Sequence, residues 1–542
     1  MEREVYLKPN VVFEPLVNQW YAWSHLISPA TLALNIQRRH FTIMQSYIDN
    51  PEIHRNAASN PKMKGGPFMD FKENSVDRVT ALLQKTLEEN TDLLQLADAI
   101  QELDALLRNQ NKGVGLDEIY QKVPTILRGL VELYYDRNHH ADFRFFEPLL
   151  YQSDFYKAKS QGVALWLTEN DERPFVLSTP RFEDHNSVYL DLAFNRPEID
   201  LLAKMKWHPS SYDRIQQVLG IKTEQKDIFQ TFFTDEPPRP YNRYTGDKVR
   251  MRYMGHACIL IETREVSILL DPLLSYYGYL NGLDRFSDMD LPPVIDYVVI
   301  THNHQDHILF ETLLPIRHKI GKVIVPRTYG GKLEDPNLKL MLNSIGFNNV
   351  VEVGEMDLLQ FDDISVQALP FTGEHCDLDI LTKACYFIKI GNFKLLFFAD
   401  SKATIPEMYE RVHSLTGDVD VMFLGMECDG APLSWLYGPL LTQKLTRVQD
   451  QSRRLAGSNC KEGIKLVNIF NPKEVYVYAM GLEPWLEFIT TARNADDANP
   501  IVQSNQLIRE CREMGLVSER LYGEKEILYD KNIVPGEGVL MV

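Results

Sequence analysis

Three histidines and one aspartate fall within six consecutive positions of the chain, at His302, His304, Asp306 and His307. They follow directly on the apolar segment "IDYVVIT", which is typical of a β-strand that ends in a loop. Alternate residues of an extended chain share a face, so such a loop can aim several side chains at one point. Imidazole and carboxylate groups at this spacing predict two metal ions about 3.5–4 Å apart. The alternative, a run of surface polar residues, accounts poorly for four ligand-type residues in so short a segment.

The sequence around this motif predicts a layered α/β domain. Short apolar runs such as "ACILIE", "VSILLD" and "FKLLFFAD" alternate with helical segments such as "LKLMLNSIG" and "IPEMYERVHSL". Strands that interleave with helices in this way are characteristic of sheets covered by helices. We therefore expect a domain over residues 246–542 whose strand ends position the histidine motif.

The preceding residues, 1–245, have a different pattern. Leucines recur at steps of three and four from Ser75 to Lys112, which predicts a helix. Apolar segments at Gly162–Leu167 and Ser187–Phe194 predict strands. Three prolines within four positions in the segment 232–248 predict a linker or an exposed crossing of the chain. The chain is thus expected to begin with a mixed α+β N-terminal domain.

Composition narrows the class of protein. With 542 residues, of which 44% are apolar and 24% charged, the chain is long enough for two globular domains. Its six cysteines form no CxxC pair, which favours free thiols in a reducing cytoplasm. The net charge of -18 argues against a nucleic-acid partner. No apolar run is long enough for a membrane helix, and "MEREVYLKPN" does not have the pattern of a signal or transit peptide, so we expect a cytoplasmic protein without membrane association.

The motif resembles the metal-binding motif of the metallo-β-lactamase superfamily. The segment "MGHACILIETREVSILLDPLL" is similar to the opening hairpin of that fold, with Asp271 in its Asp-Pro pair. The segment "LLFFADS" is similar to the strand that ends in the bridging aspartate, here Asp400. The resemblance covers residues 249–482 and implies an αββα sandwich with the metal ions at the strand ends.

The chain departs from the hydrolases of this superfamily at two places. Their third ligand is a histidine directly after a glycine, whereas the loop "PFTGEHCDLD" has Glu374 after Gly373 and His375 one place later. Adjacent residues of an extended loop point in different directions, so we favour Glu374 as the ligand over His375. The hydrolases also use a late histidine, but His413 is the last histidine of this chain.

These departures change the set of metal ligands that the resemblance implies. The first metal would be held by His302, His304 and Glu374, and the second by Asp306 and His307, with Asp400 as the bridge. Two imidazoles and one carboxylate are the ligands of non-haem iron that activates oxygen. Additional carboxylate charge makes a metal ion a weaker Lewis acid, so a zinc hydrolase gains less from this set.

The combination of features resembles a smaller family, the dinuclear-iron β-hydroxylases of the chloramphenicol pathway, and "MECDGAPLSWLYGPL" is also similar to that family. The resemblance implies an oxo-bridged cluster of two Fe ions, with Glu374 and Asp400 as catalytic ligands, O2 as co-substrate and an external electron donor, a reductase or ferredoxin. The implied substrate is an amino acid, held as a thioester on a carrier domain of a nonribosomal peptide synthetase and hydroxylated at its β-carbon. The N-terminal domain is implied to form a homodimer and to shape substrate access.

The hairpin motif is shared with metal-dependent hydrolases of the lactonase or phosphodiesterase type, which use Zn or Mn, so such a hydrolase remains the alternative. Near the motif, His256 is expected to be a structural neighbour and not a ligand. Glu427 and Asp429 either bond to a ligand or cap a strand end. Trp435 and Tyr437 either line a substrate pocket or belong to the core.

One basic segment suggests how a carrier domain would dock. The segment Gln443–Lys465 is rich in lysine and arginine, and its leucine and valine spacing predicts a helix with a basic face. Carrier domains are commonly acidic, so this face is a candidate docking surface that includes Arg453 and Arg454. A solvated helix face is the alternative.

Overall fold

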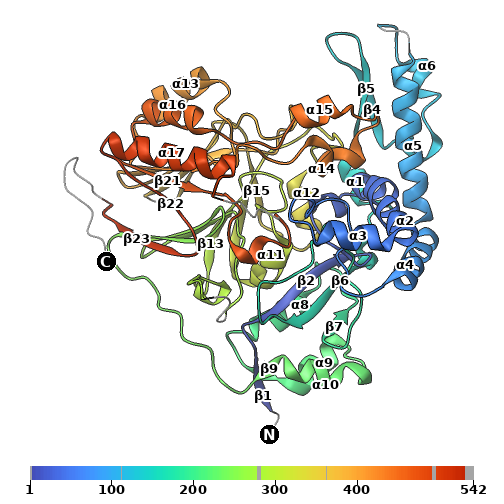
Figure 1. Ribbon diagram of the computed structural model, residues 1–542, viewed down its shortest axis with the longest axis horizontal. Helices are drawn as coiled ribbons and strands as arrows, with labels where there is room; N and C mark the ends of the chain where they lie inside the picture. Colours follow the sequence, from blue (N-terminus) through green and yellow to red (C-terminus); the bar gives the residue numbers. More distant parts are fainter. Residues whose placement is uncertain (1–2, 111–112, 278–281, 362, 491–495, 532–542) are drawn as a thin grey trace.

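The computed structural model describes residues 3–110, 113–277, 282–361, 363–490 and 496–531 (Figure 1). Two seven-stranded sheets form the centre of its second half. The first contains, in spatial order, β15 (Val350–Val353), β14 (Ile320–Pro326), β13 (Ile295–Val299), β12 (Ser267–Leu270), β11 (Cys258–Glu262), β10 (Val249–Gly255) and β23 (Lys525–Tyr529). The second contains β16 (Leu358–Phe361), β17 (Ile364–Leu369), β18 (Cys385–Ile390), β19 (Phe393–Phe397), β20 (Val421–Gly425), β21 (Glu474–Tyr478) and β22 (Val517–Arg520).

The two sheets pack face to face. Apolar side chains from both sheets, such as Ile259, Ile388 and Phe397, form one buried cluster between them. Helices cover the outer faces: α11 (Phe310–Ile316) and α12 (Leu338–Ser344) on the first sheet, and α13 (Pro406–Thr416), α16 (Cys460–Phe470) and α17 (Asn499–Glu513) on the second. Strands such as β10, β11 and β20 are buried at every position, so both faces of each sheet require cover. The predicted αββα sandwich is confirmed.

The N-terminal part is a mixture of helices and small sheets, as predicted. A four-stranded sheet contains β3 (Trp20–Tyr21), β2 (Val11–Val17), β6 (Gln161–Leu167) and β7 (Ser187–Leu190). A three-stranded sheet contains β8 (Ser210–Ser211), β1 (Glu4–Leu7) and β9 (Phe233–Thr234). A hairpin consists of β4 (Val131–Tyr135) and β5 (Ala141–Phe145). Its helices are α1 (Pro29–Asn35), α2 (Phe41–Asp49), α3 (Pro51–Ala58), α4 (Val76–Glu89), α5 (Thr91–Arg108), α6 (Asp117–Tyr120), α7 (Glu147–Tyr151), α8 (Pro197–Lys204), α9 (Tyr212–Leu219) and α10 (Lys226–Thr231).

Two predicted boundaries in this part were wrong. The helix expected over residues 75–112 is divided into α4 and α5 at Asn90, whose side chain donates to the Thr86 carbonyl and accepts from Asn18. Asn111 and Lys112 lie outside the described residues. The strand expected to reach Phe194 ends at Leu190, because the chain then turns and the Leu192 amide bonds back to the Leu190 carbonyl.

The N-terminal part and the sandwich share one hydrophobic core. Helix α11 of the sandwich packs against β2 and α8, and apolar side chains of both parts belong to the same buried cluster. Arg173 crosses the boundary with two hydrogen bonds to Glu311 of α11, at 2.7 and 2.9 Å. The linker predicted over residues 232–248 begins with strand β9; its remaining residues, 235–248, contain no helix or strand and run in extended form from β9 toward the side of β23 (Figure 1). The division at residues 245 and 246 stays a prediction, and residues 532–542 lie outside the described chain.

A glycine contact between the two parts gives a stability prediction. Gly331 has a φ of +61°, and a Cβ built there would lie 2.2 Å from the Phe145 carbonyl oxygen. Gly331→Ala is expected to lower the free energy of unfolding by roughly 2–3 kcal/mol, through left-handed strain and loss of the Phe145 N–H bond to the Gly331 carbonyl. Gly129→Ala is the matched control, because Gly129 also has a positive φ of +80° but nothing within 4 Å of its Cβ position. Equal losses in denaturant unfolding of the two variants would contradict the steric argument.

Candidate metal centre

The predicted metal-binding residues come together where strands of the two sheets end. His302, His304, Asp306 and His307 lie in the loop between β13 and α11, Glu374 in the loop between β17 and β18, and Asp400 after β19. The three histidines and Glu374 are buried. Ligand atoms of these residues, with His256, form three groups of three, and within each group the atoms lie within 4.8 Å of one another.

The first group contains His302, His304 and Glu374. Its shortest separation joins His304 Nδ1 to Glu374 Oε1 at 2.9 Å, and His302 Nε2 lies 3.1 Å from His304 Nδ1. His302 Nε2 is 3.8 Å from Glu374 Oε2. Burial, reinforced by the neighbouring histidines, lowers the pKa of His302 well below its ordinary value, so this imidazole is in the neutral form that binds metals.

The second group contains Asp400 with His302, which it shares with the first group, and His307. Asp400 Oδ2 is 3.1 Å from His307 Nε2 and 4.0 Å from His302 Nε2, which is the position a bridging carboxylate requires. The remaining group contains Asp306 and His307 together with His256. The structure thus places all six predicted residues in one cluster.

The cluster fits a pair of cations. Glu374 Oε2 and Asp400 Oδ1 are buried carboxylate oxygens without a hydrogen-bond partner among the described residues. Burial raises the pKa of Glu374 to about 7; His304 opposes this rise, and the carboxylates of Asp400 and Asp306 add to it. Buried carboxylates in this situation are normally paired with cations or metal ions. Three imidazoles and three carboxylates therefore suit two divalent ions.

Backbone geometry distinguishes Glu374 from its neighbour His375. Gly373 and Glu374 both have positive φ, +75° and +63°, and a Cβ at Gly373 would lie 2.4 Å from Lys402 Cβ. This tight turn directs Glu374 to the cluster. His375 stacks on the His304 ring, and its Nδ1 lies 3.3 Å from the Gly373 carbonyl, so it belongs to none of the three groups. The preference for Glu374 as ligand agrees with this geometry and stays a prediction.

Asp271 fixes the orientation of His307. Its Oδ2 lies 2.8 Å from His307 Nδ1, and its two oxygens accept bonds of 2.7 and 2.6 Å from the backbone N–H and hydroxyl of Thr301. A carboxylate on the outer ring nitrogen fixes the tautomer and leaves Nε2 free for a metal. Sequence reasoning identified Asp271 only as part of the Asp-Pro pair, and it did not assign a role to Thr301.

Tyr437 plays a similar part for His304. This residue of α14 (Leu433–Tyr437) is buried, and its hydroxyl lies 3.0 Å from His304 Nε2. The sequence left Tyr437 open between pocket and core, and its contact with a candidate ligand was missed. The only available signal was an aromatic hydroxyl in the "SWLYGPL" segment.

His256 lies beside Asp306 and His307 and forms one of the three groups with them. Its Nδ1 accepts a bond of 3.2 Å from the Gly481 N–H, and its Nε2 lies 3.4 Å from Asp306 Oδ2 without a hydrogen-bond partner among the described residues. The expectation that His256 is a structural neighbour and not a ligand stays a prediction. Glu427 accepts from the Asp429 and Gly430 amides, so it caps the turn after β20, and no hydrogen bond among the described residues joins it to a candidate ligand.

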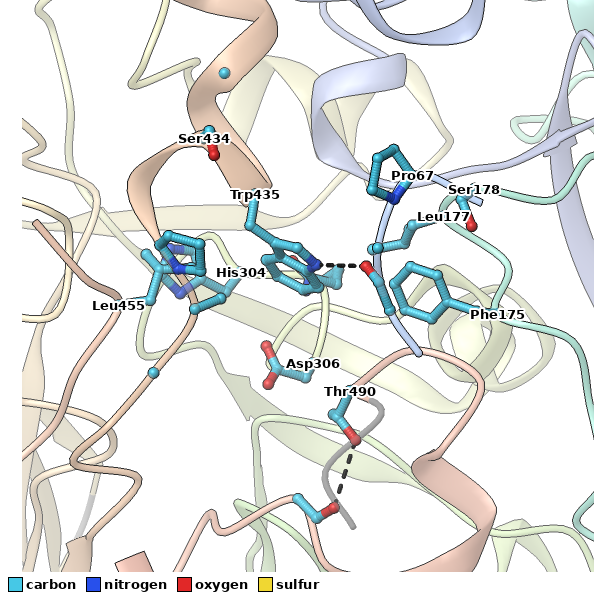
Figure 2. A pocket seen from close by; sticks show the side chains of 18 of the residues that line it. Pro67, Phe175, Leu177, Ser178, His304, Asp306, Ser434, Trp435, Leu455 and Thr490 are labelled. Atoms are coloured by element: carbon cyan, nitrogen blue, oxygen red, sulfur yellow. Dashed lines mark hydrogen bonds between the residues drawn. The ribbon is translucent and has the colours of Figure 1, made fainter. Parts of the chain in front are cut away.

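A cavity of about 840 Å³ opens onto the cluster. His304, Asp306, Glu374 and Asp400 line its inner part, and apolar side chains line its walls: Phe68, Phe175, Leu177, Trp435, Leu455 and Met480. Figure 2 shows Trp435 and Phe175 approaching each other across the cavity, where the Trp435 indole N–H donates to the Gly65 carbonyl at 2.9 Å. Trp435 thus lines the cavity. A cavity of this size and lining suits a small, largely apolar group.

The basic helix predicted over residues 443–465 was wrong. The structure has two helices, α15 (Arg447–Ser452) and α16, separated by an irregular segment. Asn459 caps α16 by accepting from the Glu462 amide, which fixes a new helix start. Arg453 donates to the Cys376 carbonyl and Arg454 to the carbonyls of Asp429 and Gly430. Both arginines therefore hold loops beside the cluster and do not form a helix face.

Comparisons with known proteins place the chain in a family. The family model described as "Diiron non-heme beta-hydroxylase N-terminal domain" matches residues 6–237, and the "Beta-lactamase superfamily domain" matches residues 267–430. The chain is 39% identical, over 95% of its own length and 98% of the relative's, to the 4-amino-L-phenylalanyl-[CmlP-peptidyl-carrier-protein] 3-hydroxylase of Streptomyces venezuelae. The chain belongs to the diiron non-haem β-hydroxylase family. As a member it is an enzyme, a non-haem diiron monooxygenase, and the resemblance predicted from the motifs is confirmed.

A solved structure of this β-hydroxylase family has the same fold. CmlA, a diiron β-hydroxylase from Streptomyces venezuelae, is 38% identical and superposes with a TM-score of 0.91 over 97% of this chain and 100% of that chain. Similarity to hydrolases is more limited: a metal-dependent hydrolase of Rhizobium johnstonii is 37% identical over 60 residues, which is 11% of this chain and 24% of that protein. The hydrolase alternative therefore has only distant support. Among the described residues, no helix is both long and apolar enough to span a membrane.

Proposed function

We propose that this enzyme hydroxylates the β-carbon of an amino acid that a carrier domain presents as a thioester. The observation that carries the proposal is the cluster of three imidazoles and three carboxylates, in which two carboxylate oxygens are buried and have no hydrogen-bond partner among the described residues. The related hydroxylase of Streptomyces venezuelae is named for a substrate on a peptidyl carrier protein, and the two chains match over nearly their whole lengths.

We assign the iron ligands from the grouping of the side chains. His302, His304 and Glu374 would hold one iron, Asp306 and His307 the other, and Asp400 would bind both. When bound, the two iron ions supply the activation of O2, for which an external donor provides two electrons. The protein holds the ligands in position: Asp271 orients His307, and Tyr437 orients His304.

The cavity determines which part of the substrate reaches the cluster. Its apolar walls, including Phe175 and Trp435, fit an apolar or aromatic amino-acid side chain and exclude water from it. The cavity would hold the β-carbon beside Glu374 and Asp400, and holding the reacting atom in position can supply a large part of an enzyme's rate enhancement. Phe68 and Phe175 come from the N-terminal part, so that part shapes substrate access.

The remaining partners follow from the proposed reaction. A reductase or ferredoxin would deliver the two electrons, and a nonribosomal peptide synthetase would provide the carrier domain. We further propose that the enzyme works in the cytoplasm as a homodimer formed through the N-terminal domain, residues 1–245. Analytical ultracentrifugation tests the dimer.

The metal content tests the proposal directly. Protein reconstituted with ferrous iron under anaerobic conditions is expected to contain about two irons per chain and, after exposure to air, to show the absorption of an oxo-bridged ferric pair. Elemental analysis and an optical spectrum measure both. Protein from iron-supplemented cells that carries only zinc and hydrolyses esters would support the hydrolase alternative instead.

A further inference from the structure

The active-site cavity is lined by four basic side chains, three of which form no ion pair among the described residues. Arg38, Arg39, Lys62 and Lys64 all line the cavity that leads to the cluster. This is unusual for a chain with a net charge of -18. Of the four, only Lys64 forms an ion pair among the described residues, with Glu487 at 3.0 Å.

The two arginines are held in place by backbone carbonyls. Arg38 donates to the carbonyls of Pro439 and Leu441, and Arg39 donates to the carbonyl of Trp435. A guanidinium has five N–H donors, so each retains several for another partner. Burial lowers the pKa of Arg39 to about 10, which leaves it charged at neutral pH. Both arginines are partly exposed, and within the described residues no carboxylate forms an ion pair with either of them.

The local helix geometry is also unusual. Arg38 and Arg39 lie in a π-helical turn, Ile36–His40, between α1 and α2. Such turns are rare and occur frequently at functional sites. The turn is held by His40, which stacks on Trp20 with ring centres 4.0 Å apart. The two guanidinium groups are thus fixed in advance, which reduces the entropy cost of binding an anion.

The exposed members of the lining show where the cavity opens. Thr42, Lys62 and Pro67 are exposed, whereas His304 and Glu374 are buried at the inner end. Lys62 has no ion pair or side-chain hydrogen bond among the described residues. The exposed end of the cavity therefore includes the cation Lys62, and the partly exposed Arg38 and Arg39 line the same cavity together with apolar side chains.

We propose that Arg38, Arg39 and Lys62 bind the phosphate of a phosphopantetheine arm while its aminoacyl thioester extends along the apolar walls to the cluster. The arm has the matching order of groups: an anionic phosphate at one end, an uncharged pantetheine chain, and the acyl group at the other. Arginine and lysine are the usual phosphate ligands in proteins, and charge-assisted bonds are the strong ones. This inference rests on the proposed function and names the group that the enzyme recognises at the entrance.

Two probes that differ only in the phosphate test the site. Full-length iron-loaded protein is titrated calorimetrically with 4′-phosphopantetheine and with pantetheine. The wild type is expected to bind the phosphorylated probe at least about tenfold more tightly, the value of one charge-assisted hydrogen bond. Equal affinities, or no measurable binding of either probe, would overturn the proposal. If the phosphate site fails this test but the enzyme still hydroxylates a carrier-bound substrate, the proposed function is still supported.

Variants locate the phosphate. Lys62→Glu and Arg38→Gln are each expected to reduce the preference for the phosphorylated probe to less than about threefold, with little change for pantetheine. Lys85→Glu is the matched control, because Lys85 is exposed on α4 and does not line the cavity, and it should retain the full preference. Lys62 is exposed, so its variant tests the site even where Arg38→Gln disturbs the carbonyls of Pro439 and Leu441. A preference retained by Lys62→Glu and by a folded Arg38→Gln would refute the assignment.

Coenzyme A contains the same phosphopantetheine arm as a carrier domain, so the affinities of the enzyme for these two ligands have to be compared. A holo-carrier domain is expected to bind more tightly than coenzyme A and to lose affinity in Lys62→Glu. Tighter binding of coenzyme A would assign the site to coenzyme A thioesters and would overturn the carrier as the source.

Discussion

Replacing Glu374 by alanine is expected to remove iron from the first metal position and to abolish oxygen-dependent hydroxylation. Glu374 is the carboxylate of the group formed with His302 and His304, and its Oε1 lies 2.9 Å from His304 Nδ1. Even residues that only support a ligand change metal affinity by 10- to 100-fold, so loss of the ligand itself should lower iron affinity by at least about a hundredfold. Iron content after gel filtration and the optical spectrum of the ferric pair are the measurements.

His375→Ala is the neighbouring control for this prediction. His375 is equally buried and stacks on His304, but it belongs to none of the three ligand groups. We expect this variant to keep about two irons per chain, with a moderate loss of activity at most. Retention of iron in Glu374→Ala together with its loss in His375→Ala would restore the ligand arrangement of the hydrolases.

Turnover is expected to depend on the carrier. With the free amino acid in place of the carrier-bound thioester, kcat/KM should fall by at least about a hundredfold, because binding energy from the remote arm and carrier positions the β-carbon. The cavity supports this expectation, since its apolar walls and basic side chains extend well beyond a single amino acid. Mass spectrometry of the hydroxylated product, with each of the two substrates in turn, measures this difference in kcat/KM.

The iron spectrum is the control for the substrate comparison. It should be the same in both assays, which shows that the cluster is intact when the free amino acid reacts slowly. Hydroxylation of the free amino acid at the rate of the thioester would exclude delivery by a carrier. A thioester on a truncated pantetheine should fall between the two substrates.

The sequence predicted those parts of the site that depend on local spacing. His302, His304, Asp306 and His307 lie in one loop after an apolar strand, and that loop alone indicated a metal site. The roles of Asp271 and Tyr437 depend on contacts across 36 and 133 positions, which no local pattern reveals. Resemblance to a known family implied a role for Asp400, whereas it gave no role to Tyr437 within the similar segment "MECDGAPLSWLYGPL".

The incorrect secondary-structure predictions also result from contacts between residues that are distant in the sequence. The segment 443–465 has helical spacing, yet Arg453 and Arg454 bond to carbonyls of other loops and the chain between α15 and α16 is irregular. Asn90 divides α4 from α5 with the help of Asn18, a distant residue. In both cases tertiary contacts override a helical propensity that is individually weak.

The core shared by the N-terminal part and the sandwich has a consequence for engineering. Substrate range in this enzyme cannot be altered by exchanging residues 1–245 as an independent module, because β2 and α8 pack against α11 and Arg173 bonds to Glu311. A chimera that takes these residues from a relative would place them against sandwich residues that they do not match. Exchanging α11 as well would not be enough, because Gly331 and Trp435 of the sandwich also bond to the N-terminal part. The residues on both sides of this interface therefore have to be changed together.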